Sequence, residues 1–191
     1  MLSNPWWHYQ RARLLALFRR KSEAVAALEE ALRLDPAYVA AASLLGFLHG
    51  ARGRHDLAVE VFRKALLLSP HDAILLFNLG YVLHLQKKYQ PAVDAFEHAL
   101  KINRRIDRAW YGMGLALASL GRHEESAEAL RCAAELQPMN GHAWYELGMA
   151  YFTLDHREKL KEVIAHLNRF DPKMAHHLIR ATEEPVEAGA L

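Results

Sequence analysis

The chain has 191 residues, of which 52% are hydrophobic and 24% charged, and its formal net charge is +2 at neutral pH. This composition is typical of a globular chain with a sizeable apolar core, and the near-neutral balance lacks the sustained basic face that nucleic-acid binding requires. The single cysteine, Cys132, excludes an intramolecular disulfide, and we expect its thiol to be buried and unreactive.

The N-terminal segment predicts a helix and no targeting sequence. Asn4 followed by Pro5 is a typical helix start, with Asn as the cap and Pro at the first helical position. The apolar stretch at residues 14–18 is too short for the core of a signal peptide. The longest apolar run, residues 37–48, falls short of the roughly 18–20 residues that span a bilayer. We therefore expect a cytoplasmic protein without membrane insertion.

Five pairs of helices are predicted along the chain. The first helices are expected over 6–18, 38–51, 72–85, 106–119 and 140–153, and the second over 22–34, 55–68, 89–102, 123–136 and 157–170. Gly53 and Gly121 indicate tight turns within two of the pairs. A last helix over 174–183 suits the cap that covers the exposed end of a repeat array. The acidic, aperiodic residues 184–191 are expected to be disordered.

A period of 34 residues runs through these helices. Three sets of residues recur at this period. They are prolines, large apolar residues directly before glycine, and alanines: Pro36, Pro70, Pro138 and Pro172; Leu45-Gly46, Leu79-Gly80, Met113-Gly114 and Leu147-Gly148; Ala31, Ala65, Ala99 and Ala133. Arg104 stands where the proline series is interrupted. The small residues allow two helices to approach closely, and a large side chain of the second helix fills the gap beside them. Such a fixed period is the signature of stacked helix-turn-helix units.

In these positions the chain resembles the tetratricopeptide repeat family, most closely where Trp110, Gly114 and Pro138 recur as Trp144, Gly148 and Pro172. The resemblance implies an all-α, right-handed superhelical solenoid of about five repeats. The repeats are placed near 5–38, 39–72, 73–106, 107–140 and 141–174. With a capping helix over 174–183, we expect a single domain over 1–183. In the fifth repeat Leu160 and Leu167 replace the usual alanines, so its second helix should pack differently.

The resemblance also implies a concave groove lined by the first helices. Columns of residues 34 apart on one face of these helices are rich in aromatic side chains and are distinct from the Leu-Gly packing columns. We predict a partner-binding strip made of Phe47, Phe77, Tyr81, Arg108, Tyr111, Tyr145 and Phe152. The alternative is that several of these rings only pack between neighbouring first helices.

Within the family, some members grip a carboxylate with Lys, Asn and Arg, but here only Asn78 and Arg108 have suitable chemistry. An apolar or amphipathic segment of a partner protein is therefore the expected ligand. Two functions remain open: a non-catalytic adaptor or assembly chaperone, and a constitutive structural subunit of a larger complex or homo-oligomer of unknown stoichiometry.

The sequence carries no catalytic or cofactor motif, since it lacks a phosphate loop, a nucleophile elbow and paired carboxylates. None of the twelve histidines lies four residues from another, as a zinc pair on one helix requires. We expect no enzyme activity, no cofactor and no metal site. His84 and His142 are the histidines predicted to face the groove.

Overall fold

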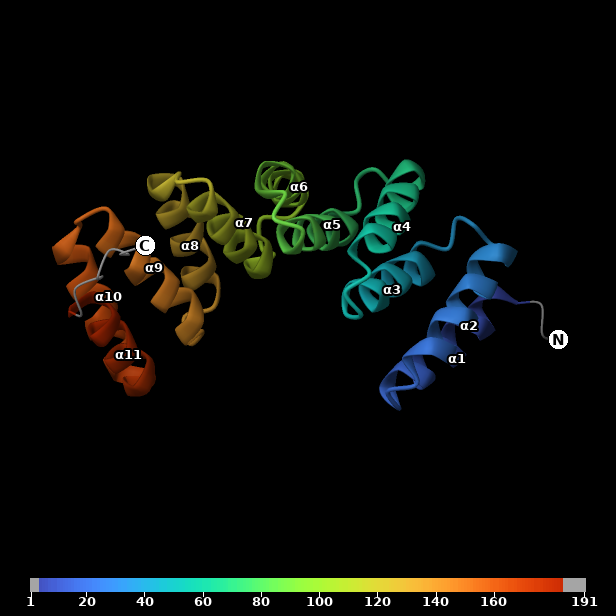
Figure 1. Ribbon diagram of the computed structural model, residues 1–191, viewed down its shortest axis with the longest axis horizontal. Helices are drawn as coiled ribbons and strands as arrows, with labels where there is room; N and C mark the ends of the chain where they lie inside the picture. The colour runs from blue at the N-terminus through green and yellow to red at the C-terminus, as the bar shows by residue number, and fades with distance from the viewer. Residues whose placement is uncertain (1–3, 184–191) are drawn as a thin grey trace, which may run out of the picture. The chain divides into compact units, whose positions relative to one another are not determined.

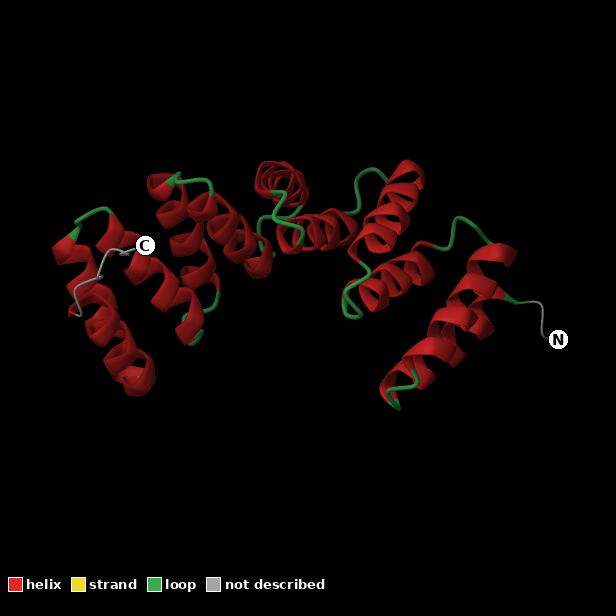
Figure 2. Cartoon of the chain, in the orientation of Figure 1, coloured by secondary structure: helices red, strands yellow, loops and turns green. Residues whose placement is uncertain are grey.

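The computed structural model describes residues 4–183, which form eleven α-helices and no strand (Figures 1 and 2). They are α1 (Pro5–Leu17), α2 (Lys21–Leu34), α3 (Val39–Gly50), α4 (His55–Leu68), α5 (Ala73–Leu85), α6 (Tyr89–Ile102), α7 (Asp107–Ser119), α8 (His123–Leu136), α9 (Gly141–Thr153), α10 (Arg157–Phe170) and α11 (Pro172–Glu183). Every boundary lies within two residues of its predicted place. The all-α prediction is confirmed, and the acidic tail predicted to be disordered lies outside the described residues.

The helices form hairpins that belong to two compact units. The first unit ends at Asn103 and holds three hairpins, α1–α2, α3–α4 and α5–α6, each packed on the next. The second unit begins at Arg104 and holds α7–α8 and α9–α10, with α11 packed on both α9 and α10. The division coincides with the position where the proline series is interrupted. A single domain over 1–183 remains a prediction.

Each of three central hairpins is closed by a glycine of the first helix and a large residue of the second. A Cβ at Gly80 would lie 2.8 Å from the ring of Phe96, and one at Gly114 would lie 2.6 Å from Leu130. Gly46 is approached by Phe62 in the same way. These contacts confirm the predicted register, because a residue larger than glycine would push the two helices apart.

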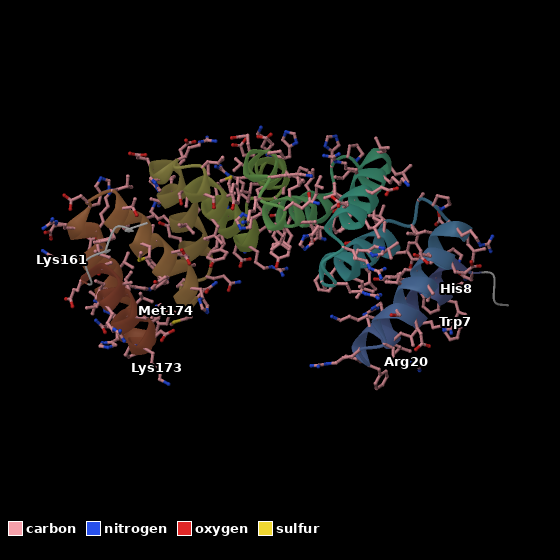
Figure 3. All side chains as sticks on the ribbon, viewed as in Figure 1. Trp7, His8, Arg20, Lys161, Lys173 and Met174 are labelled. Atoms are coloured by element: carbon pink, nitrogen blue, oxygen red, sulfur yellow. The ribbon has the colours of Figure 1, made fainter. Side chains whose placement is uncertain are left out.

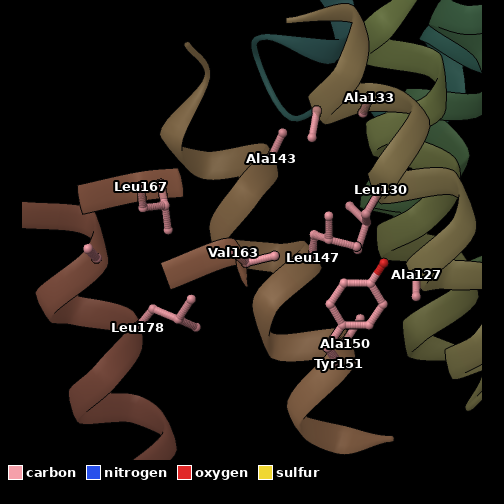
Figure 4. Close-up of a cluster of buried hydrophobic side chains, with 12 residues drawn as sticks. Ala127, Leu130, Ala133, Ala143, Leu147, Ala150, Tyr151, Val163, Leu167 and Leu178 are labelled. Atoms are coloured by element: carbon pink, nitrogen blue, oxygen red, sulfur yellow. The ribbon is translucent and has the colours of Figure 1, made fainter. Parts of the chain in front are cut away.

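The last repeat is built differently, as its leucines predicted. Leu160 stands where the other second helices carry a small residue, and Ile164, at the position of Phe96, is only partly buried. Leu178 of α11, and not Ile164, packs against Gly148. A Cβ at Gly148 would lie 2.5 Å from the Leu178 side chain. Asp171 caps α11 by accepting a hydrogen bond from the Met174 amide at 3.1 Å (Figure 3 labels Met174 and Lys173 at this end). Figure 4 shows Leu178 among the buried side chains of α9 and α10.

The turn inside each hairpin contains one residue in the left-handed region at the same repeat position. Gly53 and Gly121 have φ of 72° and 75°, as expected for the predicted tight turns. The other three hairpins place non-glycine residues there, namely Arg19, Lys87 and Asp155, with φ of 58°, 59° and 53°. The backbone course of the turn is therefore set by the repeat geometry, whichever residue occupies it.

Candidate partner-binding surfaces

The first unit presents polar and aromatic side chains on one side of α3 and α5, here called the α3–α5 face (Ser43, Phe47, Asn78 and Tyr81). The two helices contact each other directly, and the Asn78 side-chain amide donates a hydrogen bond to the Ser43 hydroxyl at 3.4 Å. Phe47 and Tyr81 lie one helical turn further along the same sides. Their side chains are 58% and 51% exposed, so two large rings project into solvent from neighbouring helices.

Phe77 does not belong to this exposed set, although it was predicted to lie in the binding strip. Its residue exposure is only 8%, and its ring centroid lies 6.1 Å from that of Phe96 on α6. The ring is directed into the contact between α5 and α6 and is part of the core. Phe77 therefore packs within its own hairpin, against a second helix, and not between neighbouring first helices as the packing alternative proposed.

The second unit has a corresponding α7–α9 face, defined by Arg108, Tyr111, Tyr145, Glu146 and Phe152. Arg108 and Phe152 are exposed, whereas Tyr111 and Tyr145 are half-buried. α7 and α9 are in direct contact, which places the predicted residues of this unit on adjoining helices. The two tyrosine rings thus contribute both to packing and to the surface.

Glu146 adds a half-buried carboxyl to the α7–α9 face, and this residue was not predicted from the sequence. Burial raises the pKa of the Glu146 carboxyl, and the charge of His142 offsets this only in part. Burial also raises the pKa of the Tyr111 and Tyr145 hydroxyls, and the nearby Glu146 charge raises it further. The sequence did offer one indication of this residue. At the repeat position of Glu146, the other four repeats carry residues that do not ionise: Gln10, Leu44, Asn78 and Gly112.

Helix α11 also contributes to this face. The ring of His177 lies 5.0 Å from that of Tyr145, so the capping helix borders the predicted strip at its last aromatic residue. From the sequence, α11 was predicted only to cap the array, and no surface role was predicted for His177. Adjacent positions 176 and 177 diverge around a helix, and the contact identifies which of them turns toward α9.

The two histidines predicted to face the groove, and the cysteine, differ in their surroundings. His84 packs 5.5 Å from Tyr89 of α6, and burial lowers the pKa of its imidazole. His142 is exposed. Cys132 is half-buried where full burial was expected, and desolvation raises the pKa of its thiol. Across residues 4–183, no three His, Cys, Asp or Glu side chains come together as metal ligands would.

Comparisons with known protein families identify the same repeats that the helical hairpins form. Family models described as tetratricopeptide repeat match residues 8–38, 38–105, 92–136 and 111–155. Together these matches run from the first helical hairpin into the last, across the division at Arg104.

Several solved structures share the fold. A structure of the protein MamA is 21% identical with a TM-score of 0.76 and covers 100% of each chain. YrrB, described as a tetratricopeptide repeat protein with an unusual peptide-binding site, is 24% identical with a TM-score of 0.74, covering 91% of this chain and 90% of its own. The PilF protein of Pseudomonas aeruginosa is 18% identical with a TM-score of 0.78, covering 93% and 86%. No curated protein sequence matches the chain.

Proposed function

The chain belongs to the tetratricopeptide repeat family, and from that premise we propose that it is a non-catalytic adaptor or assembly chaperone. In this proposal the α3–α5 face holds an apolar or amphipathic segment of a partner protein. The α7–α9 face, with its half-buried tyrosines, provides a second contact surface. The peptide-binding site of YrrB, a structural relative, supports the choice of a peptide segment as the ligand.

The observation that carries the proposal is the exposed pair Phe47 and Tyr81. Large aromatic side chains provide much contact area at a low cost in conformational entropy, and they are frequent at the centres of protein interfaces. The polar groups beside them, Ser43 and Asn78, already bond each other. The named residues of this face are uncharged, which favours an apolar segment over a carboxylate or a phosphate.

Site-specific photo-crosslinking tests this proposal. A benzophenone amino acid replaces Tyr81 in one protein and Leu67, which is 84% exposed on α4, in the control. Both proteins are irradiated in cells that contain the native partner, and crosslinked peptides are identified by mass spectrometry. The proposal requires one partner segment, rich in apolar residues, that crosslinks at position 81 and is absent at position 67.

The crosslinked segment is then synthesised, and its affinity is measured by calorimetry. Phe47→Ala and Tyr81→Ala should each weaken binding by roughly 30-fold, as expected for a central aromatic contact, while Leu67→Ala leaves it unchanged. Binding insensitive to both aromatic substitutions would exclude the α3–α5 face. Light scattering on the isolated protein adds a separate check, because an obligate oligomer would instead indicate a structural subunit.

A further inference from the structure

The N-terminal helix α1 exposes an apolar side to solvent. Its inward side is formed by Ala12 and Leu15, which belong to one buried cluster with side chains of α2 and α3. The opposite side carries large side chains that are between 51% and 74% exposed: Trp6, Trp7, Leu14, Leu17 and Phe18. The helical period places Trp7, Leu14 and Phe18 on one stripe, with Trp6 and Leu17 adjacent to it. We call these five residues the α1 outer face.

Positive charge surrounds this face. The first 22 residues contain no Asp or Glu but five cations, at Arg11, Arg13, Arg19, Arg20 and Lys21. The helical period puts Arg11 on one edge of the α1 outer face and Arg13 on the other. Arg20 is neutralised in part by Glu23, which it contacts at 2.6 Å. The other cations leave this end of the protein positive, which contrasts with the net charge of +2 for the whole chain.

The charge and shape of the face limit what can cover it. A second copy docked by a two-fold axis would bring identical clusters of arginine together, which is unfavourable. A bound peptide would need a groove with two walls, whereas the shallow hollow here is lined by Gln10, Arg13, Leu14 and Leu17, all from α1. A single apolar helix side flanked by cations instead matches a flat, anionic surface.

We propose that the α1 outer face docks on an anionic lipid bilayer, with its aromatic and leucine side chains entering the boundary between headgroups and acyl chains. Trp6 and Trp7 stack with centroids 6.2 Å apart, and tryptophan favours this interfacial depth. Arg11 and Arg13 would bind lipid phosphates from the two edges. In this arrangement α1 would lie along the surface of the bilayer. No helix within residues 4–183 is long and apolar enough to cross a membrane. This docking is independent of the α3–α5 face.

Vesicle flotation of the full chain tests the proposal. The probes are vesicles of pure phosphatidylcholine and vesicles containing about 30% phosphatidylserine, an anionic lipid. We expect binding to the anionic vesicles that weakens with added salt, and little binding to the neutral ones. Leu14→Ser combined with Phe18→Ser should reduce the partition coefficient by about tenfold or more. Arg11→Gln combined with Arg13→Gln should reduce it by about fivefold for each charge removed.

Matched controls are Leu67→Ser and Arg63→Gln, which change exposed residues of α4 and should leave the partition coefficient unchanged. Circular dichroism melts confirm that each variant is folded. Three results would overturn the proposal: no binding to anionic vesicles, equal loss in the α4 controls, or a dimer in light scattering that Leu14→Ser with Phe18→Ser dissociates. The last result would assign the face to a second copy of the chain.

Discussion

Two phenylalanines on neighbouring first helices have opposite surroundings. Phe47 projects from α3 with 58% of its surface exposed, whereas Phe77 of α5 is buried against Phe96. We expect Phe77→Ala to lower the free energy of unfolding by about 3–5 kcal/mol, because it leaves a cavity between α5 and α6. Urea denaturation measures this loss. Phe47→Ala is the control and should change stability by no more than about 0.5 kcal/mol, and a similar cost for both variants would contradict the assignment of Phe77 to the core.

Glu146 should give the protein a specific dependence on pH. Because burial raises the pKa of its carboxyl in the folded state, the folded protein binds a proton more tightly than the unfolded chain. Its contribution to stability is therefore present below the ordinary glutamate pKa and is lost as the pH rises through the raised value. We expect Glu146→Gln to melt at a higher temperature than the parent at neutral pH, with the difference shrinking in acid.

Thermal melts at several pH values measure this difference. Glu135→Gln is a suitable comparison, since Glu135 is exposed and pairs with Arg131 at 2.6 Å on α8. That pair would be lost in the variant, so its neutral-pH melting temperature should stay the same or fall. An advantage of Glu146→Gln that persisted undiminished in acid would show that the effect does not arise from ionisation.

The sequence predicted which residues share a face but not how far each side chain is exposed. Phe47, Phe77 and Tyr81 were placed on first-helix columns because a helix repeats every 3.6 residues. Their exposure depends on how closely the neighbouring helix approaches, and the repeat position of a residue does not reveal that distance. Glu146 was missed for the same reason, since its pKa shift arises from packing around the carboxyl.

At the scale of elements, α11 completes the last hairpin by inserting Leu178 against Gly148. Leu178 is fully buried, so Leu178→Ala should lower the free energy of unfolding by about 2–5 kcal/mol. The exposed Leu67 provides the control, and Leu67→Ala should be nearly neutral. Urea denaturation of both variants measures the difference. A small cost for Leu178→Ala would mean that α11 is only loosely attached and does not stabilise the last repeat.

Helix boundaries were predictable because several series of residues share the 34-residue period, and each series indicates the same boundaries. The leucines at 160 and 167 also indicated that α10 would pack differently. That Leu178 would approach Gly148 in place of Ile164 was not predictable, because it depends on how α11 packs on α9 and α10. In the three central hairpins the corresponding glycine is approached by a residue of its own second helix, so they offered no precedent for this contact.

At the scale of the whole molecule, contacts are made between successive hairpins within each unit, so perturbations should remain local. We expect Leu178→Ala to accelerate amide hydrogen exchange in α9, α10 and α11 while leaving α3 and α4 unchanged. Exchange followed by mass spectrometry under native conditions measures this. If the two groups of amides accelerated equally, the chain would unfold as one cooperative body.

The contact between Leu178 and Gly148 also determines how this array could be lengthened by design. A repeat duplicated between Leu68 and Ala73 would meet a standard hairpin on both sides, since the α3–α4 and α5–α6 hairpins both have the close contact between a glycine and a phenylalanine. A repeat inserted between Phe170 and Pro172 would move α11 away from α9 and leave Gly148 uncovered. Modular extension is therefore expected to succeed inside the first unit and to fail at the α10–α11 junction.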